Sequence, residues 1–323
     1  MFFIVNSQHS IDALLKLHTP PAGIFLYDHL NGFDADYKNP LVTAVDQYAA
    51  TQGQSMVVKY HQFLPEQVKI NYPNLTFQFE LTDFAVKNFK SFIDYKDFPV
   101  RSQEHFICSF NGIGHVSRQL LVAALHQRGW FDPESVSKNF SFSTEMIDGH
   151  IQSYVKGKDR VYRKFFITDE SEPFFQTVSG FGHERDLHDQ NIHTLENILT
   201  SSFLNIVSES VATSSVPYIT EKALYSVVTK GLFLAYAQPG WHRCLEQQYG
   251  LKPYRNLFDY KFDSVTNPVV RLIELLGMIS KFENLSTADK HDLYQLERDT
   301  IEYNYHYYFS GEMLTKLLGH TDN

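Results

Sequence analysis

Cysteine is scarce in this 323-residue chain. Its two cysteines, Cys108 and Cys244, form no CxxC pair and do not have the spacing of a zinc site. Few cysteines without a pairing pattern are typical of proteins in a reducing compartment, so we expect a cytoplasmic protein.

Long apolar runs and a basic leader are also lacking. No run approaches the roughly 18 apolar residues that a membrane-spanning helix needs. The start, Met1-Phe-Phe-Ile-Val5, is too short for a signal peptide and has no basic residues, so it predicts a first strand. We therefore expect no membrane partner.

Positive charge is in deficit. The chain has 28 Lys and Arg against 37 Asp and Glu, a net charge of −9. This balance argues against broad non-specific binding to nucleic acid, although it leaves room for a local basic strip. The length is enough for two domains of ordinary size, and no internal repeat or low-complexity tract interrupts them.

The most informative part of the chain has the length of a βαβ unit. An apolar run at 203–207 ends just before Glu209. A Ser/Thr-rich loop leads to an amphipathic segment that Thr220 opens and Gly231 closes, and a second apolar run follows at 232–236. The pattern predicts strand, loop, helix and strand, with Thr220 as N-cap and Gly231 as C-cap glycine.

The polar residues of this unit suit a nucleoside diphosphate. In an open α/β sheet, ligands bind outside the carboxyl ends of the strands, where Glu209 falls. Lys222 adds a cation at a helix start that already favours phosphate. Phosphates would repel Glu221, which we expect to accept hydrogen bonds from ribose hydroxyls. The alternative is that Thr220-Glu221-Lys222 is only a helix cap.

These residues also carry a family resemblance. Glu209-Ser210 and Tyr218-Ile-Thr-Glu221-Lys222 resemble the donor-binding signature of α-1,3-fucosyltransferase-like enzymes, and more closely that of their uncharacterised bacterial and bacteriophage members. The resemblance implies an α/β GT-B fold, in which two Rossmann-like domains face each other across a cleft. It also implies metal-independent, inverting transfer from a GDP- or UDP-linked sugar, with no further cofactor.

Ser210 departs from the family pattern, which has Asn at that place. The resemblance therefore predicts the fold and the donor class better than the identity of the sugar.

A second strand–turn–helix precedes the unit: a strand at 105–110 runs into Asn111 and Gly114, although not with GxGxxG spacing. By resemblance, Arg118 or His115 reaches the donor phosphates. The alternative is that Asn111 is a turn residue and Arg118 a solvated charge.

The expected organisation has three parts. Residues 1–98 form an acceptor-side α/β domain, residues 99–300 form the nucleotide-sugar domain, and a helix within 301–323 crosses back to the first domain. The expected donor-binding residues are Asn111, His115, Arg118, Glu209, Ser210, Tyr218, Thr220, Glu221 and Lys222.

Inverting transfer also needs a general base on the acceptor side. We favour Asp28, which ends a predicted strand at 23–27 and opens a polar loop. His61, Glu80 and Asp83 also follow predicted strands, and the alternative for Asp28 is a turn cap.

Residues 150–195 have no regular pattern and are expected to be irregular. Within them, 155–165 carries five cations and one acid, which suits acceptor or donor phosphates, or else a solvated edge strand. His183, His188 and His193 match no familiar metal-ligand spacing.

The acceptor stays open between a glycan and a hydroxymethylated base in bacteriophage DNA, which places the protein in the cytoplasm of a bacterium or of a virus-infected host cell. A non-catalytic nucleotide- or sugar-binding protein on a degenerate GT-B scaffold is the alternative function.

Overall fold

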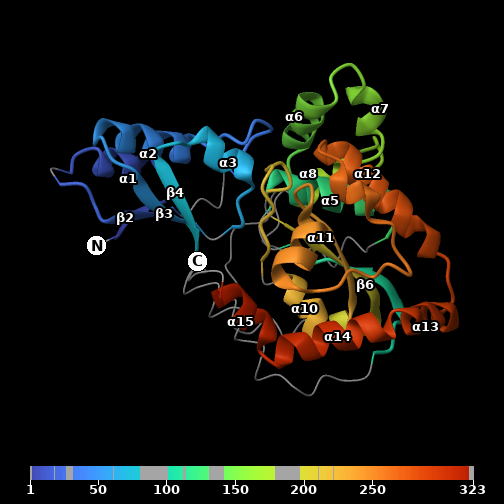
Figure 1. Ribbon diagram of the computed structural model, residues 1–323. Coiled ribbons are helices and arrows are strands. Elements are labelled where there is room, and N and C mark those ends of the chain that lie inside the picture. Colours follow the sequence, from blue (N-terminus) through green and yellow to red (C-terminus); the bar gives the residue numbers. More distant parts are fainter. Residues whose placement is uncertain are drawn as a thin grey trace.

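The computed structural model is an α/β protein with two parallel sheets (Figure 1). It describes residues 2–17, 19–26, 32–60, 62–80, 101–111, 114–130, 142–178, 197–209, 211–220 and 222–319. Two hydrophobic cores form, one on each sheet. None of the helices in these ranges is both long and apolar enough to cross a membrane.

The first sheet has four parallel strands in the order of the chain. They are β1 (Phe2–Val5), β2 (Gly23–Leu26), β3 (Met56–Tyr60) and β4 (Leu75–Phe79), linked in part by α1 (Gln8–Leu14), α2 (Pro40–Thr51) and α3 (Glu66–Asn71). Right-handed crossovers between neighbouring strands place these helices on one face, where Figure 1 shows them. β3 alternates accordingly between buried and half-buried residues.

The second sheet has three parallel strands, β5 (His105–Cys108), β6 (Ser202–Ser208) and β7 (Leu232–Tyr236), with β6 in the middle. Every residue of β6 and β7 is buried, as in a parallel sheet covered on both faces. α5 (Val116–Gln127) follows β5, and α10 (Lys222–Val228) connects β6 to β7. The predicted strand, loop, helix and strand are confirmed.

The remaining elements in the described ranges are helical and surround the second sheet (Figure 1). They are α6 (Thr144–Tyr154), α7 (Asp159–Arg163), α8 (Glu172–Val178), α11 (Trp241–Cys244), the π-helix η3 (Leu245–Tyr249), the 3₁₀ helices η4 (Tyr260–Ser264) and η5 (Ser280–Phe282), α12 (Pro268–Ile279), α13 (Thr287–Leu296), α14 (Arg298–Phe309) and α15 (Glu312–Gly319).

These helices bear on two expectations. The prediction of irregular structure from residue 150, with an edge strand as one reading of 155–165, is wrong for the described part, because α6, α7 and α8 occupy it. α14 and α15 pack on the second core through Ile301, Tyr308, Met313 and Leu317. The crossing of residues 301–323 to the first domain stays a prediction.

The end of α10 differs from the prediction at Gly231. The left-handed residue is Lys230, with φ of 52°, and not the glycine. The Lys230 amide donates to Val227 O at 3.1 Å and the Gly231 amide to Ser226 O at 2.6 Å, which is the Schellman pattern one residue earlier. Glycine is favoured at 231 for space, because a Cβ there would lie 3.0 Å from Arg101 Nη1.

The two sheets are joined by the loops that follow β2 and β6. Val216, from the loop after β6, is fully buried in the first core. The Ser215 amide donates to Phe33 O at 2.8 Å, and the Phe33 amide donates to Ser214 Oγ at 3.1 Å. Because both loops leave the carboxyl ends of parallel strands, these contacts bring the carboxyl edges of the two sheets together.

Gly32 lies close against Ser214 at this junction. It has φ of 60°, and a Cβ there would lie 2.5 Å from Ser214 Cβ. We expect Gly32→Ala to lower the free energy of unfolding by about 2–4 kcal/mol, from backbone strain and overpacking together.

Gly53→Ala is the matched control, because Gly53 has φ of 66° with nothing within 4 Å of a Cβ. It should cost only about 1 kcal/mol of strain. Urea unfolding of both variants measures the difference, and equal losses would show that the loop contact does not hold the sheets together.

Candidate functional site

Glu209 is the first residue after β6, and its side chain is fully buried. Its carboxylate accepts hydrogen bonds from the Thr220 amide at 3.1 Å and from Thr220 Oγ1 at 2.9 Å. Lys222 Nζ lies 3.5 Å from the second carboxylate oxygen and 3.0 Å from Thr220 Oγ1. The structure therefore brings together three predicted site residues that are up to thirteen positions apart in the sequence.

In this arrangement Glu209 has a structural role, whereas Lys222 is available to a ligand. A buried carboxylate is stable only when it is paired and hydrogen-bonded, and Thr220 and Lys222 provide both. Lys222 is 19% exposed, so its ammonium group is held from inside by Glu209 and still reaches the surface. Glu209 therefore fixes the loop end and orients Lys222, which is the side chain open to a ligand.

α5 adds two more nitrogen-bearing side chains to the same place. His115 is half-buried at the N-cap position, and Arg118 follows one turn later and is 5% exposed. Burial lowers the pKa of His115, and the positive charges of Arg118 and Lys222 lower it further. Ser117 Oγ, between them, accepts from the Ala212 amide at 3.2 Å, which ties α5 to the loop after β6. The result is a local site of positive potential that suits an anion.

Polar atoms at the ends of β5 and β6 complete the site. Asn111 Nδ2 donates to Ser109 Oγ at 3.0 Å, and Ser109 Oγ donates to Ile206 O at 2.7 Å. Within the described part of the chain, Asn111 Oδ1 and Ser208 Oγ are buried and have no hydrogen-bond partner. Buried polar atoms without a partner are costly, so they are candidate contacts for a bound molecule.

Tyr218 is held by its backbone. Its amide donates to Gln238 Oε1 at 3.2 Å, and its carbonyl accepts from Trp241 Nε1 at 3.0 Å. Gln238 Nε2 in turn donates to Val211 O at 2.7 Å, so the loop after β7 clamps both ends of the loop after β6.

Arg271 is a supporting residue that sequence reasoning missed. It is 1% exposed on α12, and Nε donates to Ala237 O at 2.9 Å. Nη1 donates to Thr266 O at 3.1 Å, and Nη2 donates to Ala212 O. The available signal was a charged residue among the apolar residues of α12 (Pro268–Ile279), because a charge on an apolar helix face is unusual unless it has partners inside the protein.

The first sheet reaches the same region through aromatic side chains. Phe63, after β3, stacks on Phe79 at 4.0 Å between ring centroids and meets Tyr249 of η3 edge-on at 6.0 Å. Burial raises the pKa of Tyr249, and its neighbours Cys244, Tyr218 and Glu209 raise it further. Glu209 therefore lies close to the junction of the two sheets. Tyr249, which contacts Phe63 of the first sheet, is a second residue of this region that sequence reasoning missed.

Several predicted residues lie outside the described ranges. They are Asp28, Ser210 and Glu221 of the predicted site, and His61, Asp83, His183, His188 and His193. The roles of Asp28 as a base and of Glu221 as a ribose ligand stay predictions. Glu80 is described and forms an ion pair with Lys59.

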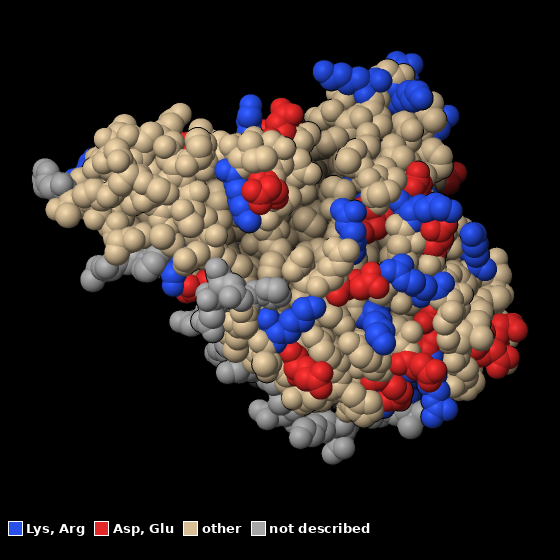
Figure 2. All heavy atoms as spheres, in the orientation of Figure 1, with Lys and Arg blue, Asp and Glu red and all other residues tan. Residues whose placement is uncertain are grey.

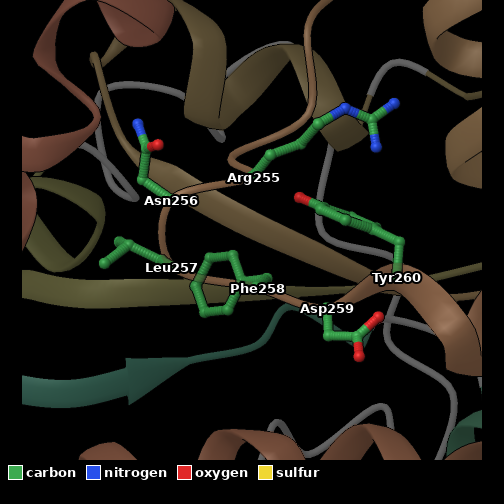
Figure 3. Close-up of a pocket in the computed structure, with 6 residues that line it drawn as sticks. All are labelled: Arg255, Asn256, Leu257, Phe258, Asp259 and Tyr260. Atoms are coloured by element: carbon green, nitrogen blue, oxygen red, sulfur yellow. The ribbon is translucent and has the colours of Figure 1, made fainter.

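A shallow hollow of about 370 Å³ lies elsewhere, lined by residues 255–260 (Figure 3). Tyr254, at the start of this loop, donates from Oη to Gly231 O at 3.1 Å, which places the loop near the amino end of β7. That is the opposite edge of the sheet from Glu209, so this hollow is separate from the candidate site.

A different recess is visible in Figure 2, where the surface is hollowed between the helices of the first sheet and the lobe of α6 and α7.

Comparison of the chain with protein-family models, with curated proteins and with solved structures finds no match. The function is therefore inferred from the residues of the site themselves.

Thr220→Val tests the buried carboxylate, because it removes the hydroxyl that donates to Glu209 and leaves the volume nearly unchanged. We expect the free energy of unfolding to fall by about 1–3 kcal/mol, the cost of a missing hydrogen bond to a buried charge. Thr229→Val is the control, since its hydroxyl donates to the neutral Tyr225 carbonyl. Chemical denaturation compares the two, and a smaller loss at Thr220 than at Thr229 would contradict the role of Glu209.

Proposed function

We propose that this protein is a nucleotide-sugar-dependent glycosyltransferase of the GT-B type, which inverts the anomeric carbon, needs no metal and transfers the sugar to an acceptor hydroxyl. The observation that carries the proposal is the convergence of His115, Arg118 and Lys222 at the carboxyl edge of the second sheet, with Lys222 fixed by the buried Glu209.

The charge of this cluster suits the diphosphate of an activated sugar. As the bond between sugar and diphosphate breaks, negative charge grows on the leaving phosphate. Arg118 and Lys222 stabilise that charge without a metal ion, and protonated His115 adds a third positive group. Asn111 Oδ1, after β5, can only accept a hydrogen bond, so it suits a hydroxyl of the donor and not its phosphates.

The junction of the sheets supports the two-domain part of the proposal. Residues 1–98 form the acceptor-side domain and 99–300 the donor-side domain, and the loops after β2 and β6 meet at their carboxyl edges. A base from the first domain then faces the donor, and Asp28 in the loop after β2 is the proposed one. The acceptor is a glycan or a modified DNA base, and the compartment is the cytoplasm.

Titration calorimetry with GDP, UDP and their sugar conjugates tests donor binding. Arg118→Gln and Lys222→Ala each remove one charge-assisted contact, so we expect the affinity for the preferred nucleotide to fall ten- to a hundredfold. Lys261→Ala is the control, because Lys261 is exposed and pairs with Asp259 at the surface.

Lys222→Ala also takes a partner from Glu209, so each variant's unfolding is measured alongside. Unchanged affinity in folded Arg118→Gln and Lys222→Ala proteins would overturn the site. Binding without transfer or donor hydrolysis would instead identify a non-catalytic nucleotide-sugar-binding protein on the same scaffold.

The pH dependence of binding reports on His115. Its pKa is lowered in the free protein, and a bound diphosphate favours the imidazolium and raises that pKa. The imidazolium contribution to affinity therefore grows as the pH falls from about 7 towards 5, where histidine titrates.

The diphosphate itself takes up a proton in this range, so the informative quantity is the difference from His115→Gln. Calorimetry at several pH values should show the wild-type protein gaining affinity relative to the variant as the pH falls. Parallel pH profiles for the two proteins would exclude contact between His115 and the phosphates.

A further inference from the structure

The segment from the end of α6 to the end of α7, residues 154–165, carries a group of cations that the donor site does not use. We call it the α6–α7 tip, and its exposed cations are Lys156, Lys158, Arg160 and Lys164. Figure 2 shows blue side chains gathered over this lobe, on a protein whose net charge is −9. The local charge is therefore opposite to that of the molecule as a whole.

Apolar and aromatic side chains lie among these cations. Val161 is 62% exposed, Phe165 40% and Tyr154 39%. Exposed rings beside lysine and arginine are the pairing with which proteins hold single-stranded nucleic acid, where bases stack and phosphates meet cations.

The tip is firmly supported. Arg163 binds Asp148 of α6 through Nε at 3.0 Å and Glu172 of α8 through Nη2 at 2.5 Å, so its charge is neutralised internally. Asn267 Nδ2 donates to Tyr154 O at 2.8 Å, which fixes the end of α6 to the start of α12. The four exposed cations thus project from a defined scaffold.

α6 also links the tip to the donor site. Gln119 of α5 donates to Gly114 O at 2.6 Å and accepts from the amide of Ser143, the N-cap of α6, at 2.8 Å. The base of α6 is therefore tied to the turn that carries His115. Eleven residues later α6 ends at the tip, which at 1.5 Å per residue is about 16 Å away.

That distance favours a polymer over a small anion. Nucleic acid carries a phosphate every few ångströms, so one strand spans such a distance and meets several of the cations at once. A lipid surface is less suited, because α7 has only five residues and offers no long amphipathic face.

We propose that the α6–α7 tip binds the phosphate backbone of a nucleic acid, and that the acceptor of the transferase is therefore a base within that nucleic acid. The second half rests on the proposed function, whereas the first half stands on the tip alone.

The test uses the full chain and a fluorescent 30-nucleotide DNA, single-stranded or duplex, with anisotropy read at several salt concentrations. A tip variant changes all four exposed cations to glutamine: Lys156→Gln, Lys158→Gln, Arg160→Gln and Lys164→Gln. The control variant makes the same charge change outside the tip: Lys252→Gln, Lys261→Gln, Lys281→Gln and Arg298→Gln, all exposed.

We expect the tip variant to bind DNA at least tenfold more weakly and to show a flatter salt dependence, by about 0.7–0.9 in slope for each phosphate that the protein no longer neutralises. The control should change less than twofold, and Phe165→Ala should weaken single-stranded binding more than duplex binding.

Equal losses of affinity in the tip and control variants, or no DNA binding by the wild-type protein at low salt, would overturn the tip proposal. Tip-dependent binding to vesicles containing phosphatidylserine, without binding to DNA, would also overturn it and identify a lipid surface. DNA binding that depends on the tip, in a protein that binds neither GDP nor UDP, would uphold the surface and reject the transferase.

Discussion

The buried carboxylate of Glu209 is the constraint on which the site depends. It ends the central strand β6 without any exposure to solvent, so its charge must be balanced inside the protein. Thr220 and Lys222 supply that balance, and in doing so they fix where the loop returns and where α10 begins. One internal interaction thus closes the loop and aims an ammonium group at the carboxyl edge of the sheet.

The same loop joins the two halves of the molecule. Between Glu209 and Thr220 it buries Val216 in the first core and exchanges hydrogen bonds with Phe33. A ligand that changes the position of Lys222 therefore acts on a segment that both sheets hold. This coupling suits a two-domain enzyme, in which donor binding on one side must be matched by acceptor binding on the other.

Much of the fold was readable from the sequence, because buried parallel strands are short apolar runs between polar turns, as at 203–207 and 232–236. Helices α6, α7 and α8 were not, since partners on neighbouring helices stabilise them, as Asp148 and Glu172 do for Arg163. For the site, residue types at strand ends predicted the grouping of Glu209 with Lys222. The sequence did not show that Glu209 is a buried support while Lys222 reaches the surface, nor that Arg271 supports the loops. Both depend on burial in the folded protein, which no local sequence pattern encodes.

A crystal structure with bound GDP or UDP tests the central claim most directly. The account predicts phosphate oxygens within hydrogen-bond distance of Lys222 Nζ and the Arg118 guanidinium, with Glu209 still buried against Thr220. A nucleotide seated in the hollow lined by residues 255–260, or at any place away from the carboxyl edge of the second sheet, would contradict it.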